Sequence, residues 1–291
     1  MFTGSIVALV TPMDQQGRLD LSAVRKLVDL HLKNGTSALV VAGTTGESPC
    51  LDGPEFQALL SAVSEQVAGA VPVIAGTGSA NTAKSVELTR RAAELGADAV
   101  LVVTPYYNRP TQNGLIAHFS AIADAAPVPV LMYNVPARTG VDMQAETTVA
   151  LAQHPRIAGI KEALPDLDRV ANLLGSCPED FSILSGDDGT CAQAMLRGAA
   201  GVVSVAANVD PARMSALCRA ALAGDRQSTE WVDGELRELF RLLGIEPNPI
   251  PVKWALQELG LIQGGIRLPL QVLEERHRGP VRACLKNLQL I

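Results

Sequence analysis

A lysine interrupts one of the most apolar segments of the sequence, and a lysine in that setting can act as a nucleophile. Lys161 lies within residues 157–163, Ile-Ala-Gly-Ile-Lys-Glu-Ala, a segment typical of a buried strand. Burying a charged ammonium is costly, so such a position favours the neutral amine, which attacks a ketone to form a Schiff base. The alternative is a structural ion pair with Glu162, but neighbouring residues of a strand point to opposite faces. We therefore predict that Lys161 is a catalytic amine.

Schiff-base chemistry also needs a group that moves protons. Tyr133 lies in the apolar segment 129–136 and could supply this group, with the hydroxyls of Thr44 and Tyr107 relaying the proton. The alternatives are that Thr44 only caps a turn and that Tyr107 only packs against neighbours. All three tyrosines of the chain follow or end apolar segments, which favours a shared site.

The segment 43–46, Gly-Thr-Thr-Gly, is a second candidate for ligand binding. Backbone N–H groups in a turn of this kind can receive a carboxylate, and we expect Glu47 to orient the turn rather than to exchange protons. The segment 76–78, Gly-Thr-Gly, resembles part of a phosphate loop but lacks the third glycine and the lysine of the nucleotide-binding motifs. Nucleotide binding is therefore not predicted.

Short apolar segments must position these residues. They span residues 5–12, 38–43, 72–78, 98–105, 129–136, 157–163, 181–188 and 201–209. Continuous apolar sequence is typical of strands buried on both faces of a parallel sheet, and amphipathic helical segments lie between the strands. The alternation predicts an α/β protein, a (β/α)8 TIM barrel whose active site lies at the C-terminal ends of the strands. An open doubly wound sheet would show the same alternation.

The chain continues beyond the eighth unit. We expect residues 1–224 to form the catalytic barrel and residues 225–291 to form a C-terminal helical domain. The proline-rich segment 246–251, Glu-Pro-Asn-Pro-Ile-Pro, would be a rigid corner. Lys253 directly follows this corner, and we expect it near a surface or an interface.

Composition limits the partners of the protein. The 291 residues carry 24 Lys and Arg against 30 Asp and Glu, a net charge of −6, with only 2 Trp, 3 Tyr and 5 Phe. This composition argues against nucleic acid and against an anionic membrane surface. The 5 Cys and 4 His are scattered, so we predict neither a metal site nor a disulfide framework. Without a signal peptide or a membrane span, a cytoplasmic location is expected.

Six segments, in order along the chain, resemble the dihydrodipicolinate synthase family. They are GTTGES (43–48), TPYYNRP (104–110), YNVPARTG (133–140), GIKEA (159–163), LSGDD (184–188) and EPNPIPVKWAL (246–256). This family belongs to the pyruvate-dependent class I aldolases, which are lyases. The resemblance implies condensation of pyruvate with L-aspartate 4-semialdehyde on the pathway to diaminopimelate and lysine. It also implies a homodimer or homotetramer, with no metal and no cofactor beyond the covalent Schiff base.

The resemblance assigns roles to individual residues. It implies that Lys161 is the Schiff-base lysine, that Tyr133 is the catalytic tyrosine, and that Thr44 and Tyr107 form the proton relay. It also implies that Thr44 and Thr45 bind the carboxylate of pyruvate and that Arg138 binds the carboxylate of the aldehyde. Gly186 and Val203 would form part of the pocket wall. In the family the tyrosine at the position of Tyr107 reaches across a subunit interface.

Two other functions are open at this point. One is a different pyruvate-dependent aldolase, such as N-acetylneuraminate lyase. Arg138 argues against it, because a sugar aldehyde prefers groups that bind hydroxyls. The other is a barrel that binds a keto acid or a protein without turnover, against which the presence of Lys161 and Tyr133 argues.

One departure from the family pattern concerns regulation. Lysine-inhibited members bind free lysine through a serine, two ring-bearing or histidine side chains, an asparagine, a glutamate and a tyrosine. At those positions this chain has Ser48, Gly53, Phe56, Ala80, Lys84 and Tyr106. Lys84 reverses the sign of the charge that would face the ligand's ammonium. We therefore expect insensitivity to feedback by L-lysine.

Overall fold

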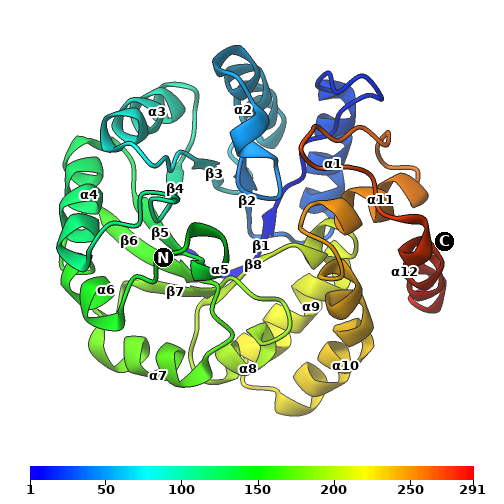
Figure 1. Ribbon diagram of the computed structural model, residues 1–291. Coiled ribbons are helices and arrows are strands. Elements are labelled where there is room, and N and C mark those ends of the chain that lie inside the picture. The colour runs from blue at the N-terminus through cyan, green and yellow to red at the C-terminus, as the bar shows by residue number, and fades with distance from the viewer.

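The computed structural model, which describes residues 1–291, has a closed barrel of parallel strands in the order β1 to β8 (Figure 1). The strands are β1 Gly4–Ala8, β2 Ala38–Val41, β3 Val73–Gly76, β4 Ala99–Val103, β5 Val130–Asn134, β6 Ile157–Glu162, β7 Ser182–Ser185 and β8 Gly201–Ser204. The closed order confirms the predicted TIM barrel and excludes the open sheet.

The helices surround this barrel and extend beyond it. They are α1 Leu21–Lys33, α2 Gly53–Val67, α3 Thr82–Glu94, α4 Gln112–Ala125, α5 Pro136–Thr139, α6 Ala145–Leu151, α7 Leu167–Ser176, α8 Cys191–Leu196, α9 Pro211–Leu222, α10 Arg226–Leu243, α11 Ile250–Glu258 and α12 Glu275–Asn287, with the short 3-10 helices η1 Ser48–Cys50 and η2 Ala206–Asn208. None of these helices combines the length and the apolar character that crossing a membrane would need.

The barrel closes where β8 pairs with β1, two strands from opposite ends of the barrel sequence. Gly4 is in register with Gly201, and the N–H of Gly4 donates to the carbonyl of Ala200 over 2.9 Å. A Cβ at Gly201 would lie 2.3 Å from the carbonyl oxygen of Gly4, so a side chain there has no room. Glycine at this position therefore lets the two backbones approach closely enough to pair.

Local sequence signals account for the helix ends. Asp52 accepts from the N–H of Glu55, whose side chain accepts in return from the N–H of Asp52, which forms a capping box at the start of α2. Gly35, Gly96 and Gly198 follow α1, α3 and α8 with φ of 76°, 91° and 115°. These left-handed conformations favour glycine and are typical of the residue that follows the end of a helix.

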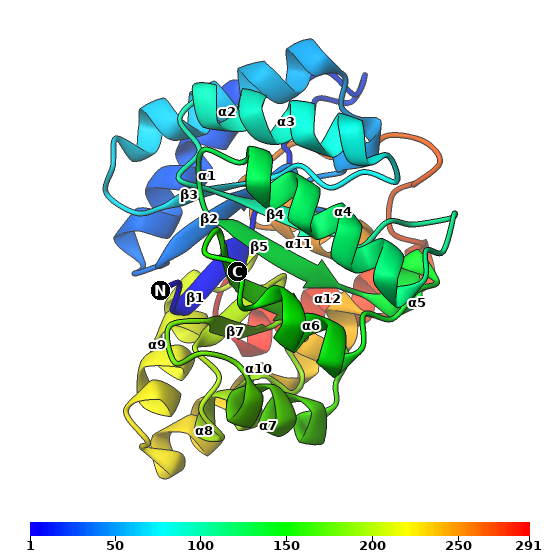
Figure 2. The same ribbon diagram turned by 90° about the vertical axis from the view of Figure 1, so that its left-hand side faces the viewer.

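The core has two parts, separated by the wall of strands. Apolar side chains such as Leu60 and Phe119 fill the space between strands and helices. A smaller group fills the barrel interior and includes Leu101, Tyr133 and Val203. Figure 2 shows the strands from the side, with α2 and α3 above them and α7 and α8 below. Polar groups at one end of the interior therefore stand on a packed apolar floor.

The last three helices lie along one side of the ring, beside α1 and α9 (Figure 1). Gly224, with φ of 72°, precedes Asp225, which caps α10 by accepting from the N–H of Ser228. We propose the boundary between barrel and C-terminal domain at this turn, between residues 224 and 225. The helices α11 and α12 contact each other and α10.

Candidate active site

Lys161 and Tyr133 lie side by side inside the end of the barrel. They are in register on the adjacent strands β6 and β5, and only 5% of Lys161 and 6% of Tyr133 is exposed. Lys161 Nζ lies 4.3 Å from the centre of the Tyr133 ring. The geometry thus brings a buried amine and a phenol into contact, where the two groups can act on one substrate atom.

Glycine at position 186, on the loop after β7, makes room for the lysine. A Cβ at Gly186 would lie 3.0 Å from Lys161 Cε and 2.8 Å from the Cβ of Ala163. Val203 of β8 is buried and belongs to the same interior group as Tyr133. Both predicted pocket-wall residues therefore lie at the end of the barrel that holds the lysine.

Glu162 does not pair with Lys161, as strand geometry predicts. Its side chain is fully buried on the outer face of β6, with Oε2 2.8 Å from Arg169 Nε. Asn134, in register with it on β5, donates from Nδ2 to both carboxylate oxygens over 3.2 and 3.0 Å. Burial raises the pKa of Glu162, while the N–H of Leu164 and the guanidinium of Arg169 oppose that shift.

The outer-face network extends to the loop between α5 and α6. Asn134 Nδ2 also donates to Asp142 Oδ1 over 2.8 Å, and Asn134 Oδ1 accepts from the N–H of Met143 over 3.0 Å. Arg169 pairs with Asp142 over 3.0 Å. Polar groups therefore join β5 and β6 directly behind Tyr133 and Lys161.

The turn 43–46 follows β2 and presents free backbone donors. The N–H groups of Gly46 and Glu47 donate to the carbonyls of Gly43 and Thr44, but those of Thr44 and Thr45 donate to no protein group. Thr45 is buried, whereas Thr44 is half-buried. The pair of unbonded N–H groups can receive a carboxylate, as predicted for this turn.

Asn248 links this turn to Arg138 and was not predicted as a site residue. Its Nδ2 donates to Thr45 Oγ1 over 2.9 Å, and its backbone carbonyl accepts from Arg138 Nη2 over 3.3 Å. Arg138 itself is exposed on α5. Asn248 is more than a hundred residues from either partner in sequence, so spacing could not indicate that it belongs to the site. The only indication in the sequence is its place in the segment 246–256.

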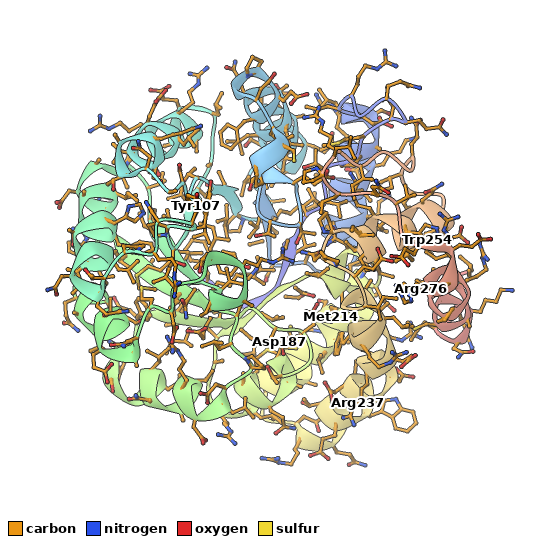
Figure 3. The ribbon with its side chains drawn as sticks, in the orientation of Figure 1. Tyr107, Asp187, Met214, Arg237, Trp254 and Arg276 are labelled. Atoms are coloured by element: carbon orange, nitrogen blue, oxygen red, sulfur yellow. The ribbon has the colours of Figure 1, made fainter.

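Tyr107 lies apart from the other predicted residues. It follows β4 with φ of 72°, and 94% of it is exposed (Figure 3). No hydrogen bond joins the hydroxyls of Thr44, Tyr107 and Tyr133 in the single chain. The predicted proton relay is therefore not assembled within one subunit.

The expectation that Lys253 lies near a surface is wrong, and the alternative of a position near an interface stays a prediction. Only 4% of it is exposed, and its Nζ lies 2.5 Å from Glu47 Oε1. Burial lowers the pKa of Lys253, and the adjacent Glu47 carboxylate opposes that shift. The proline-rich corner turns the first part of α11 inward, so a lysine that directly follows it reaches the buried end of η1. That Glu47 orients the turn stays a prediction, and this ion pair is the contact through which it could do so.

A cavity of about 430 Å³ opens beside the site, between the loop after β7 and α10. Gly186, Asp187, Asn248 and Arg237 line it, and Figure 3 shows Asp187 and Arg237. A larger surface groove, of about 910 Å³, lies between α2 and α3. Since that groove contains none of the predicted catalytic or substrate-binding residues, the buried lysine rather than cavity size defines the site.

One group of side chains could share a metal ion, and it lies in the C-terminal region. Glu246, Glu274 and His277 place their donor atoms within 4.8 Å of one another. Arg276 Nε lies 2.8 Å from Glu274 Oε2 and 3.2 Å from His277 Nε2, so a cationic side chain already contacts two of the three residues.

The fold and the site are those of a TIM-barrel lyase, and comparisons with known proteins identify its family. Residues 1–288 match the dihydrodipicolinate synthetase family, and the chain belongs to that family. It is 52% identical, over 287 residues and 99% of each chain, to the 4-hydroxy-tetrahydrodipicolinate synthase of Methylococcus capsulatus. These matches confirm the predicted family and enzyme class.

Solved structures agree over the whole chain. The chloride-inhibited dihydrodipicolinate synthase from Acinetobacter baumannii, complexed with pyruvate, matches with a TM-score of 0.99 and 46% identity, covering 100% of both chains. The enzyme from Cyanidioschyzon merolae with lysine bound matches with a TM-score of 0.97 and 38% identity, covering 100% of this chain and 99% of the other.

Proposed function

We propose that this enzyme is a 4-hydroxy-tetrahydrodipicolinate synthase that condenses pyruvate with L-aspartate 4-semialdehyde through a Schiff base on Lys161. The contact of the buried Lys161 amine with Tyr133 carries the proposal. The amine of Lys161 attacks the ketone of pyruvate, and loss of water gives the imine. In the dehydration, Tyr133 donates a proton to the departing hydroxyl group and accepts one from the amine. Deprotonation of the methyl group then yields the enamine, which attacks the aldehyde.

The other predicted residues bind the two substrates. The N–H groups of Thr44 and Thr45 receive the carboxylate of pyruvate, and they are the unbonded donors of the turn. Arg138 binds the carboxylate of the aldehyde, for which the planar guanidinium is suited. The amino group of the bound aldehyde then closes the ring and displaces the lysine. No metal or separate cofactor enters these steps.

A second subunit completes the proton relay in this proposal. Tyr107 is almost fully exposed in the single chain and makes no hydrogen bond to Thr44. A homodimer, alone or within a homotetramer, would bring Tyr107 of one subunit to Thr44 of the other. The proposed setting is the cytoplasmic pathway to diaminopimelate and lysine.

Trapping the Schiff base tests the assignment of Lys161. The enzyme is incubated with pyruvate, reduced with borohydride and digested, and the peptide containing Lys161 should carry the pyruvyl adduct. Lys161→Ala should abolish the adduct, whereas Lys286→Ala, which removes an exposed lysine of α12, should keep it. An adduct that persists in Lys161→Ala would place the nucleophile elsewhere.

Insensitivity to L-lysine is a further part of the proposal. Lys84 is exposed in the first turn of α3, and the half-buried Ala80 carries only a methyl group, so neither supplies the acidic or amide group that a bound lysine needs. Turnover should therefore stay constant as L-lysine rises at fixed pyruvate. Half-inhibition at submillimolar lysine would contradict this, and Lys84→Glu is the variant expected to increase sensitivity.

A further inference from the structure

The turn that carries Thr44 and Thr45 is held in an unfavourable backbone conformation. Ala42 and Glu47, at its two ends, have φ of 52° and 55°, in the left-handed region that residues with a Cβ adopt at a cost. Neither is a glycine, so the surrounding structure must stabilise the conformation. The hydrogen bond from Thr11 Oγ1 to the carbonyl of Gly46, over 2.7 Å, is one such restraint.

The stronger restraint comes from the C-terminal part of the chain. Both oxygens of the buried Glu47 carboxylate are used: Oε1 lies 2.5 Å from Lys253 Nζ, and Oε2 accepts from the N–H of Arg267 over 3.0 Å. Asn248 adds its hydrogen bond to Thr45. Residues that follow the barrel in sequence thus hold the turn at two of its positions.

The same C-terminal segment also binds the residues that follow the turn. Arg267 forms a two-pronged ion pair with Glu55 at the start of α2, with Nη1 2.7 Å from Oε2. It also donates to the carbonyl of Cys50 at the end of η1. The chain from Glu47 to Glu55 is therefore bound to the segment 248–267 at several positions.

We infer that Lys253 is a positioning residue for the reaction: through Glu47, and aided by Asn248, it sets the N–H groups of Thr44 and Thr45 to receive the keto acid's carboxylate. The inference rests on the proposed function of that turn. Breaking the pair should weaken pyruvate binding more than aldehyde binding, because Arg138 belongs to α5 and its hydrogen bond to Asn248 is to the backbone carbonyl, which the substitutions leave in place. The nucleophile on β6 should also be unaffected.

The test removes both charges of the pair at once. Removing one partner leaves a buried charge uncompensated, whereas Glu47→Gln with Lys253→Met leaves none. We expect this double variant to raise the KM for pyruvate at least fivefold, with little change in the KM for the aldehyde. It should still form the borohydride-trapped adduct at saturating pyruvate. The matched control, Glu258→Gln with Arg282→Met, removes an ion pair between α11 and α12 and should leave both KM values unchanged.

Two further variants keep the test decisive if the double variant does not fold. Asn248→Ala removes the bond to Thr45 without burying a charge, and it should raise the KM for pyruvate in the same direction. Lys253→Arg, which keeps a cation at this position, should keep part of the pyruvate affinity that the loss of the cation would remove. An unchanged KM for pyruvate in Asn248→Ala, or equal rises for both substrates, would overturn the inference. Failure of the unmodified enzyme to form any pyruvate adduct would instead overturn the proposed function.

Discussion

At the scale of single residues, the proposed chemistry depends on the buried position of Lys161, and Gly186 leaves room for its side chain. Lys161 could be proposed from sequence because a single cation interrupts an apolar strand. The clearance that Gly186 provides could not be identified, since it depends on a loop from a different strand approaching Lys161 Cε. The contacts of Asn248 and Lys253 could not be predicted for the same reason, because their partners lie 203 and 206 residues away.

Gly186→Ala should therefore slow Schiff-base formation. The added methyl would stand 3.0 Å from Lys161 Cε and 2.8 Å from Ala163, closer than ordinary contact, so the lysine must change rotamer. A rotamer change that moves the amine by about 1 Å should lower the rate of adduct formation on the order of 100-fold. The rate of adduct formation is measured by adding borohydride at successive times after mixing with pyruvate.

Gly175→Ala in α7 is the control for this experiment. Nothing lies within 4 Å of its added Cβ, so the rate of adduct formation should not change. Trapping at the wild-type rate in Gly186→Ala would show that the lysine side chain tolerates the methyl group.

At the scale of elements, the strands β5 and β6 act as a unit because polar groups join them behind the site. The alternation of strand and helix could be predicted, since continuous apolar segments recur between amphipathic ones. The sequence also predicted that Glu162 faces away from Lys161. It did not predict that Asn134, Arg169 and Asp142 would meet around Glu162, because three separate elements supply them.

Arg169→Met should destabilise the barrel strongly. It leaves the fully buried Glu162 carboxylate without its cation, and loss of one partner from a buried pair costs about 3 to 5 kcal/mol. Adding Glu162→Gln should recover most of that loss, because the buried charge is then gone as well. The free energy of unfolding in urea measures both effects.

Arg197→Met, which breaks an ion pair with the exposed Asp168, should change this free energy little. Equal destabilisation by Arg169→Met and by the double variant would mean that packing of the Arg169 side chain, and not the buried charge, matters.

At the scale of the whole molecule, the exposure of Tyr107 predicts that activity depends on assembly. Mixing Tyr107→Phe chains with Lys161→Ala chains should restore activity, since a mixed dimer holds one site with both groups intact. At equal mixing the recovery should approach about a quarter of the wild-type value, because half of the dimers are mixed and each has one working site.

Exchange of subunits is verified first, by mass spectrometry of the intact assembly. No recovery after confirmed exchange would mean that the relay is completed within one chain.

Stability of the whole chain should fall in mild acid because of His31. This residue is fully buried in α1, its Nδ1 is 3.0 Å from Thr36 Oγ1, and burial lowers its pKa to about 4 from 6.5. Since the unfolded chain binds a proton that the folded chain rejects, stability is retained above pH 6.5 and decreases as the pH falls towards 4. The expected loss is about 3 kcal/mol over that range.

Urea unfolding at several pH values between 7 and 4.5 measures this dependence. His31→Asn should be less stable at pH 7 but should have a shallower pH dependence. An unchanged slope in His31→Asn would assign the acid sensitivity to other groups.

The pairing of β1 with β8 has a consequence for the synthesis of the protein. The first strand leaves the ribosome early, but its partner, Gly201–Ser204, follows almost 200 residues later. At the usual elongation rates this interval is about 10 to 40 s. During that time the apolar strand Gly4–Ala8 has an edge whose partner in the fold is not yet synthesised, and such an edge can pair with another chain. The yield of active enzyme should therefore depend on how fast the chain is translated and on how well the nascent strand is shielded.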